Sequence, residues 1–172
     1  LRFLAKRNPL EVWRLLRPVL VTAFSTSSSA ATLPTALTAA REDLGVRAPV
    51  AGFVLPLGTT MNMAGTALYE GCVVLFVAQV FGIDLGFGQQ LTLLVLAVLS
   101  AVAVAAIPGG SLPLIAGLLA AFGIQPEGIG IILGVDRILD MTRTMVNVGS
   151  DVVTTVVVDR YTKLDEARPK AA

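Results

Sequence analysis

Six polar residues that could bind a charged small molecule recur along a segment that is otherwise apolar. They are Asp136, Asp140, Arg143, Thr144, Asn147 and Asp151. Spacings of 4, 3, 1, 3 and 4 residues put them within about 100° of arc on one face of an α-helix. Ionisable groups inside an apolar helix are costly, and within a membrane they mark a substrate or ion site. The row predicts such a site. The alternative, the solvated face of a soluble helix, is disfavoured by the apolar segments on both sides.

The composition indicates a helical membrane protein. Of the 172 residues 55% are hydrophobic and 15% are charged, with a mean hydropathy of +0.79. Several apolar runs approach the roughly 20 residues that cross a bilayer. The net charge of +1 is too balanced to suggest a nucleic-acid partner. A single cysteine, Cys72, and the lack of histidine exclude an intrachain disulfide, a cysteine metal site and the usual neutral-pH proton shuttle.

The first half of the chain predicts a hairpin followed by a broken helix. The hairpin, 9–45, has one arm over 9–23, a polar tip at 25–29 and a second arm that opens at Leu33–Pro34. Neither arm is long enough to span a bilayer, which favours a re-entrant hairpin buried in protein. The helix over 48–82 is long enough to span, and its glycine-rich middle, 58–66, is expected to unwind.

The second half predicts the same order of elements. A hairpin over 90–123 breaks at Ile107-Pro-Gly-Gly-Ser111, where proline and two glycines interrupt the helix. The helix with the polar row follows over 128–160, and 162–172 is expected to be a cytoplasmic tail.

The distribution of charge predicts the orientation. Of 13 Lys and Arg residues, only Arg137 and Arg143 fall inside a predicted membrane segment, and the rest lie at 2–17, 41–47 and 160–170. The charged residues of the loops 82–90 and 123–128 are only Asp84 and Glu127. The positive-inside rule places the basic stretches, and with them the C-terminus, in the cytoplasm. The two hairpins then enter from opposite sides, and with two broken helices they form an inverted repeat.

Four motifs in this order resemble those of the glutamate transporter family, whose members are sodium- or proton-coupled symporters for amino acids and dicarboxylates. They are the first hairpin tip Ser27-Ser-Ser-Ala-Ala-Thr-Leu-Pro34, the signature Asn62-Met-Ala-Gly-Thr66 (normally Asn-Met-Asp-Gly-Thr), the second tip Ile107–Ser111 and the helix Asp136–Asp151. The resemblance runs from about Pro9 to Tyr161. It implies an all-α polytopic protein of the plasma (inner) membrane. It also implies that this chain is the C-terminal part of a transport domain, from which the trimer scaffold is absent.

The resemblance assigns a substrate site to the hairpin tips and the two interrupted helices. Arg143 offers a two-toothed fork for the side-chain carboxylate of aspartate or glutamate, and a salt bridge to Asp140 is the alternative role. Asp140 should accept the substrate amino group, which disfavours a C4-dicarboxylate. The other expected contacts are Ser28, Ser29, Thr66, Ile107, Gly110, Ser111, Thr144 and Asn147.

The resemblance also implies two sodium sites made mainly of hard oxygen ligands. The first uses Asp151 with carbonyls of Gly58, Asn62 and Asn147. The second uses carbonyls at Thr60 and at Ala101, Val102 and Val104. Ala64 stands where the family has an aspartate of a further sodium site, and alanine offers no ligand oxygen. We therefore expect fewer sodium ions or partial coupling to protons. Glu70 is the candidate proton carrier, and an ordinary interfacial charge is the alternative.

These features predict a secondary active symporter for acidic amino acids that works by an elevator motion, with the lipid membrane and a homotrimer as partners. An enzyme is disfavoured because the sequence has no nucleophile–base pair and no phosphate-binding loop. The alternatives are a proton-coupled C4-dicarboxylate carrier, an anion channel and a non-transporting fragment.

Overall fold

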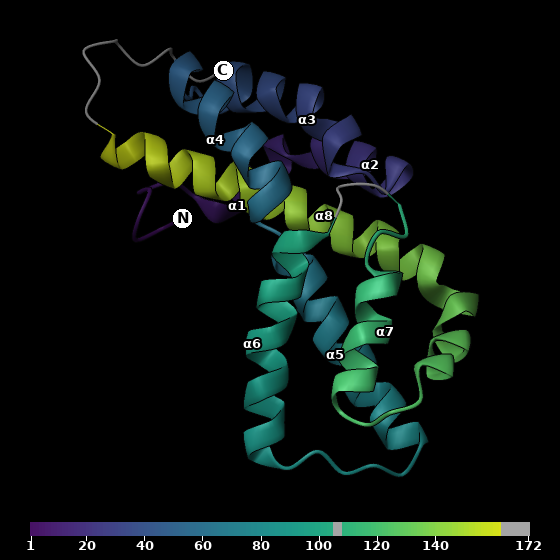
Figure 1. Ribbon diagram of the computed structural model, residues 1–172. Coiled ribbons are helices and arrows are strands. Elements are labelled where there is room, and N and C mark those ends of the chain that lie inside the picture. Colours follow the sequence, from purple (N-terminus) through teal and green to yellow (C-terminus); the bar gives the residue numbers. More distant parts are fainter. Residues whose placement is uncertain (105–107, 163–172) are drawn as a thin grey trace.

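The computed structural model describes residues 1–104 and 108–162, and the regular structure of these residues is helical (Figure 1). The helices are α1 (Pro9–Leu15), α2 (Arg17–Thr26), α3 (Ser29–Thr38), the π-helical turn η1 (Ala39–Asp43), α4 (Ala48–Met61), α5 (Ala64–Val80), α6 (Phe87–Ala103), α7 (Leu112–Ala121), the 3-10 turn η2 (Pro126–Gly128) and α8 (Ile129–Tyr161). The tail predicted at 162–172 lies outside the described residues, apart from Thr162.

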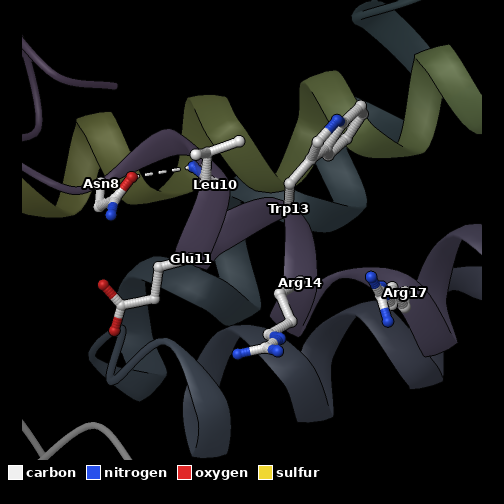
Figure 2. Close-up of a pocket in the computed structure, with 6 residues that line it drawn as sticks. All are labelled: Asn8, Leu10, Glu11, Trp13, Arg14 and Arg17. Carbon is white, nitrogen blue, oxygen red and sulfur yellow. Dashed lines mark hydrogen bonds between the residues drawn. The ribbon is translucent and has the colours of Figure 1, made fainter.

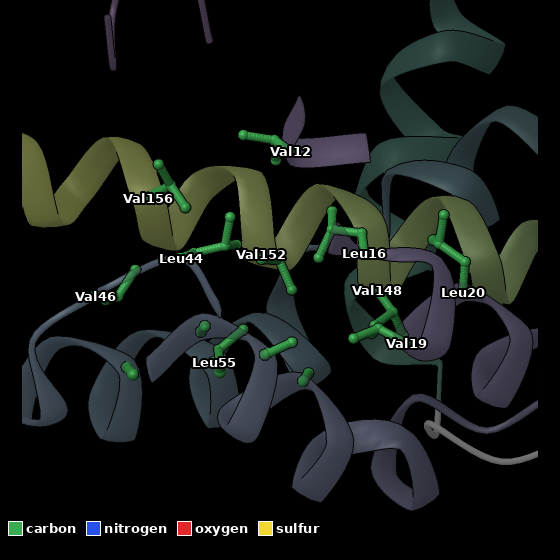
Figure 3. Packing of buried hydrophobic residues seen from close by; sticks show 14 of the residues in the cluster. Val12, Leu16, Val19, Leu20, Leu44, Val46, Leu55, Val148, Val152 and Val156 are labelled. Carbon is green, nitrogen blue, oxygen red and sulfur yellow. The ribbon is translucent and has the colours of Figure 1, made fainter. Parts of the chain in front are cut away.

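Helix α8 is the axis on which the other helices pack. It runs for 33 residues without interruption. Helices α2, α3 and α4 contact it and gather along its C-terminal half, whereas α5, α6 and α7 gather toward its N-terminal half (Figure 1). Each group has its own hydrophobic cluster. The first cluster holds Leu16, Leu55 and Val152 (Figure 3), and the second holds Val74 and Ile115.

The first hairpin departs from the predicted arms at two points. The first arm is two helices that meet at Leu16, and it extends to Thr26 rather than ending at residue 23. The second arm begins at Ser29, and Pro34 lies inside it. The reason is the cap, since Ser28 accepts a hydrogen bond from the Ala31 amide at 3.2 Å and so starts the helix ahead of the proline.

The predicted unwinding over 58–66 was too wide, because α4 continues to Met61 and α5 begins at Ala64. Only residues 62 and 63 leave helical geometry. The hydroxyl of Thr59 donates to the Leu55 carbonyl, and that of Thr60 to the Leu57 carbonyl, each at 2.9 Å. These bonds satisfy the polar side chains without unwinding the helix. Within the described part of the chain, Ala48–Val80 is the one segment long and apolar enough to cross a membrane.

The second hairpin has a longer first arm than predicted. Helix α6 begins at Phe87, three residues before the expected start at 90, and runs for 17 residues. Gly109 adopts a positive φ of 72° in the tip, a conformation that residues with a side chain rarely adopt. Residue Ile107, and with it part of the predicted break, lies outside the described residues.

A buried ion pair that the sequence did not predict joins the start of α4 to the end of α8. Arg47 Nε lies 2.8 Å from Asp159 Oδ1, and the two residues are 4% and 5% exposed. The Arg47 guanidinium also donates to the carbonyls of Asp159 at 2.6 Å and Thr162 at 2.8 Å. Arg47 is therefore an internal structural cation rather than the solvated loop charge that its position suggested.

Candidate substrate and cation site

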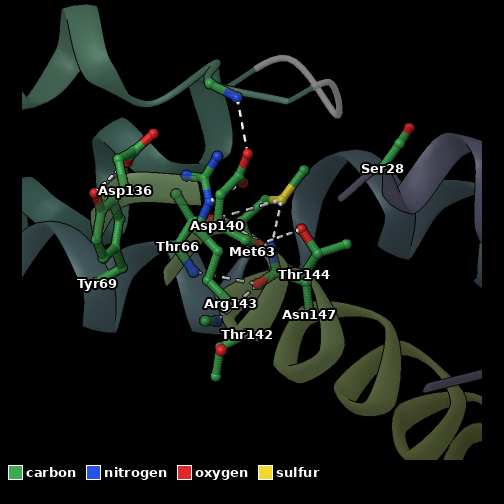
Figure 4. A network of polar contacts seen from close by, with 12 residues as sticks. Ser28, Met63, Thr66, Tyr69, Asp136, Asp140, Thr142, Arg143, Thr144 and Asn147 are labelled. Carbon is green, nitrogen blue, oxygen red and sulfur yellow. Dashed lines mark hydrogen bonds and ion pairs between the residues drawn. The ribbon is translucent and has the colours of Figure 1, made fainter. Parts of the chain in front are cut away.

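The polar row of α8 packs against α4 and α5, and Asn147 contacts the start of α5 (Figure 4). The row is buried at Asp140, Arg143, Thr144, Asn147 and Asp151, and Asp136 at its N-terminal end is half-buried. These side chains therefore lie inside the described protein, between its two groups of helices.

Asn147 holds the start of α5 against α8. Its side-chain oxygen accepts from the amides of Gly65 at 2.7 Å and Thr66 at 3.2 Å, and its amide nitrogen donates to the Thr66 hydroxyl at 3.0 Å. The first amides of a helix lack intrahelical partners, so Asn147 caps α5 from another helix. A Cβ at position 65 would lie 2.4 Å from the Arg143 carbonyl oxygen, so this close approach of two helices requires glycine.

Asp140 and Arg143 form the charged centre of the site. Arg143 Nε lies 2.7 Å from Asp140 Oδ1, and the amide of Gly109 in the second hairpin tip donates to Asp140 Oδ2 at 3.0 Å. The salt bridge considered from the sequence is thus present. It leaves the buried Arg143 NH1 nitrogen without a hydrogen-bond partner among the described residues. A buried donor of this kind is costly unless a ligand satisfies it.

Tyr69 supports the guanidinium group and was missed by the sequence analysis. The Arg143 guanidinium carbon lies 5.4 Å from the centre of the Tyr69 ring, within the range of a cation–π interaction. The Tyr69 hydroxyl donates to Asp136 Oδ1 at 2.5 Å. Position 69 is one helical turn beyond Thr66 and therefore faces α8. This spacing could have identified Tyr69 as a site residue from the sequence. Asp136 thus orients the Tyr69 ring and does not contact Arg143 itself.

The hairpin tips contribute unequally to the site. The second tip reaches Asp140 through Gly109, while Gly110 is half-buried and the buried Ser111 hydroxyl has no partner among the described residues. In the first tip Ser28 caps α3, Ser29 is buried in its first turn, and α3 contacts α8.

Two further hydroxyl or carboxyl groups were predicted to act at the site. The Thr144 hydroxyl donates to the carbonyl of Asp140 at 2.8 Å, which leaves its oxygen available as an acceptor. Glu70 is fully buried, and its Oε2 accepts a hydrogen bond from Ser100 on α6, whereas its Oε1 has no partner in the described structure. Ser100 was also missed, although it is the one polar side chain in the apolar second half of α6.

Asp151 lies beside two of the residues whose carbonyls were predicted to complete the first sodium site, Gly58 and Asn62. The side-chain amide of Asn62 donates to Asp151 Oδ1 at 2.9 Å and to the Ser150 hydroxyl at 3.0 Å. A Cβ on Gly58 would lie 2.7 Å from the same carboxylate oxygen. The Asn147 carbonyl, the third predicted one, belongs to the turn of α8 just before Asp151, while the Asn147 side chain bonds to α5.

The second predicted sodium site is less closely assembled. Thr60 has an exposed side chain at the end of α4, and Ala101, Val102 and Val104 lie at the end of α6, which contacts α4. The amide of Val104 donates to the carbonyl of Ala101 at 3.3 Å, so that carbonyl already has one partner.

A hollow of about 630 Å³ elsewhere on the surface contains none of the predicted site residues. It lies along α1 and the start of α2 (Figure 2), and its lining consists of Asn8, Leu10, Glu11, Trp13, Arg14 and Arg17.

Comparison with known proteins shows which family the chain resembles. The family model described as the sodium:dicarboxylate symporter family matches residues 1–161. The chain is 40% identical over 160 residues to an excitatory amino acid transporter of Caenorhabditis elegans, covering 93% of the chain and 32% of that protein. It is 39% identical over 158 residues to human excitatory amino acid transporter 3, covering 92% and 30%. It is 38% identical over 146 residues to the proton/sodium-glutamate symport protein of Bacillus subtilis (strain 168), covering 85% and 34%.

The chain spans about a third of the length of these curated relatives. The family is one of membrane transporters rather than enzymes, and its model covers both hairpins, the broken helix and the polar row. The chain therefore belongs to the sodium:dicarboxylate symporter family.

Proposed function

We propose that the protein is a secondary active symporter for L-aspartate or L-glutamate, coupled to sodium and to a proton carried on Glu70. The observation that carries this proposal is the Arg143 guanidinium, which is buried on a tyrosine ring and keeps one nitrogen without a partner among the described residues. A buried, pre-oriented guanidinium is suited to a carboxylate. The names of the relatives, excitatory amino acid transporter and proton/sodium-glutamate symport protein, support the same solute and the same ions.

In the proposed complex, Asp140 and Arg143 each bind the substrate group of opposite charge. The guanidinium of Arg143 donates hydrogen bonds to the side-chain carboxylate of the substrate, and the carboxylate of Asp140 accepts hydrogen bonds from its ammonium group. The remaining substrate contacts in this proposal come from Thr66, Thr144 and Asn147 on the helices and from Ser28, Ser29, Ile107, Gly110 and Ser111 on the hairpin tips. The Gly109–Asp140 bond supports a gating role for the second tip, because it ties that tip to a substrate-binding residue.

Cation binding is centred on Asp151. One sodium ion is held by Asp151 with Gly58, Asn62 and the Asn147 carbonyl, and a second by carbonyls at Thr60, Ala101, Val102 and Val104. The contacts of Asp151 with Asn62 and its closeness to Gly58 support the first site. Ala64 supplies no ligand oxygen, so a proton on Glu70 replaces part of the sodium coupling.

The arrangement in the membrane follows from the lengths of the helices and from the charge distribution. Both hairpins are re-entrant and enter from opposite sides of the plasma (inner) membrane as an inverted repeat, with the C-terminus in the cytoplasm. The site moves by an elevator motion against a scaffold that forms a homotrimer. The re-entrant form of the first hairpin is supported by the two helices that meet at its tip, because α2 and α3 have 10 residues each, about half of a membrane span.

Calorimetric titration of the purified protein with L-aspartate tests the proposal directly. We expect binding in sodium chloride and at least about 100-fold weaker binding in choline chloride at the same pH, as for sites with a coupling free energy of about 3 kcal/mol. Succinate, which lacks the amino group that Asp140 accepts, should compete poorly. Equal binding in the two salts would contradict sodium coupling, and preference for succinate would contradict the amino-acid substrate.

Gly58→Ala is expected to weaken sodium binding about tenfold or more, the range of overpacking costs in tight sites. Its Cβ would meet the Asp151 carboxylate at 2.7 Å and displace it. Gly52→Ala is the matched control, because it lies on the same helix with nothing within 4 Å of its Cβ. Sodium titrations at saturating L-aspartate measure both variants. An unchanged sodium affinity in Gly58→Ala would remove Asp151 from the sodium site.

A further inference from the structure

Only one of the two carboxyl oxygens of Glu70 has a hydrogen-bond partner among the described residues. The side chain is 0% exposed. One carboxyl oxygen accepts a hydrogen bond from Ser100, and the other has no partner in the described part of the chain. Burying an ionised carboxylate with one hydrogen bond is costly, so the group that faces it decides how readily Glu70 changes its protonation state.

The helices packed against α5 leave few candidates for that group. Helices α6 and α7 carry no ionisable side chain. On α8, the short contact of Arg143 is with Asp140, and neither salt bridge between described residues includes Glu70. On α5 itself, the Tyr69 hydroxyl is directed to Asp136. Ser100 is therefore the partner that can respond to a proton on Glu70.

The Ser100 hydroxyl has two acceptors within reach. One is Glu70 Oε2, and the other is the carbonyl of Ala97 one turn earlier on α6, at 3.2 Å. A hydroxyl carries one hydrogen and can also accept through its oxygen. It can therefore donate to an ionised carboxylate, or rotate to donate to the carbonyl while it accepts from a protonated carboxyl.

From this geometry we infer that Ser100 is a positioning residue that satisfies Glu70 in both protonation states by rotating its hydroxyl between Glu70 and the Ala97 carbonyl. The inference rests on the proposed proton coupling at Glu70. The proton comes from water when substrate binds and returns to water when substrate leaves, and no other bond is made or broken. Since Ser100 lies on the first arm of the second hairpin, α6 stays joined to α5 in both states.

The test is the pH profile of L-aspartate binding to the purified protein in sodium chloride. In the original protein, binding should weaken as pH rises and Glu70 loses its proton. In Ser100→Ala both forms of Glu70 lose the serine hydroxyl. The ionised form loses more, because hydrogen bonds to charged groups are stronger than those to neutral groups. The midpoint of the profile should therefore move to higher pH by about half to one unit. Ser100→Thr keeps the hydroxyl and should restore the original midpoint.

Two comparisons make the result decisive. Thr92→Val removes a hydroxyl from the same helix, where it bonds only to the Gly88 carbonyl at 3.0 Å and is exposed, and should leave the midpoint unchanged. Glu70→Gln should abolish the pH dependence. A Ser100→Ala profile that overlaps the original, with pH dependence still lost in Glu70→Gln, overturns the role of Ser100 alone. Binding that ignores pH in the original protein overturns the proton coupling and this inference together.

Discussion

Arg143→Gln is expected to weaken L-aspartate binding about 100-fold, because Arg143 and the substrate carboxylate would form a buried charge pair, and truncating one partner of such a pair costs about 2–5 kcal/mol of binding free energy. Glutamine removes both the positive charge and the nitrogen that has no partner among the described residues. Arg143→Lys keeps the charge without the planar fork and should recover only part of the affinity. Calorimetric titration with L-aspartate measures each variant.

The specificity of this loss can be checked within the same helix and with a second ligand. Arg137 is exposed on α8, so Arg137→Gln removes the same charge without touching the site and should bind L-aspartate as before. The preference for L-aspartate over L-asparagine should collapse in Arg143→Gln, since the guanidinium no longer distinguishes a carboxylate from an amide. A retained preference would show that Arg143 only pairs with Asp140.

Arg47→Met is expected to lower the free energy of unfolding by about 3–5 kcal/mol, because it leaves the buried Asp159 carboxylate without its cation. For a chain of this length, the midpoint of thermal unfolding in detergent should fall by at least about 6 °C. Arg41→Met is the control, since Arg41 is exposed on the nearby turn η1.

A double variant separates the two causes of this loss. Arg47→Met with Asp159→Leu removes both charges and should recover most of the stability, because an apolar pair of similar volume often replaces a buried ion pair without loss. If the double variant is as unstable as Arg47→Met alone, the loss comes from packing and from the carbonyl contacts of Arg47 rather than from the unpaired carboxylate.

Much of the fold was predictable because apolar runs and their interruptions are local properties. The helix that begins near residue 128 was predicted to within one residue of its start, since η2 ends at Gly128. The errors arose where a single side chain determines whether the backbone is helical or irregular. Ser28 starts α3 ahead of Pro34, and the hydroxyls of Thr59 and Thr60 keep α4 helical where the glycine and threonine content suggested unwinding.

The site was predictable along one helix but not between helices. Spacing alone placed Asp140, Arg143 and Asn147 on one face, and all three are buried there. What Asn147 does depends on α5 beginning opposite it, and the Ser100–Glu70 contact depends on how α6 packs against α5. Such relations join positions far apart in the sequence, and neither hydropathy nor helical periodicity contains them.

The unbroken α8 also has a consequence for how far a small rotation would carry its ends. Its 33 residues correspond to a length of about 50 Å at 1.5 Å per residue. The charged pair and the Asn147 cap lie near the middle, between the two hydrophobic clusters. A tilt of about 5° around that point would displace each end of a helix of this length by roughly 2 Å. A rearrangement of a few tenths of an ångström beside the Asp140–Arg143 pair would therefore be magnified at the distant end, where the Arg47–Asp159 ion pair joins α8 to α4.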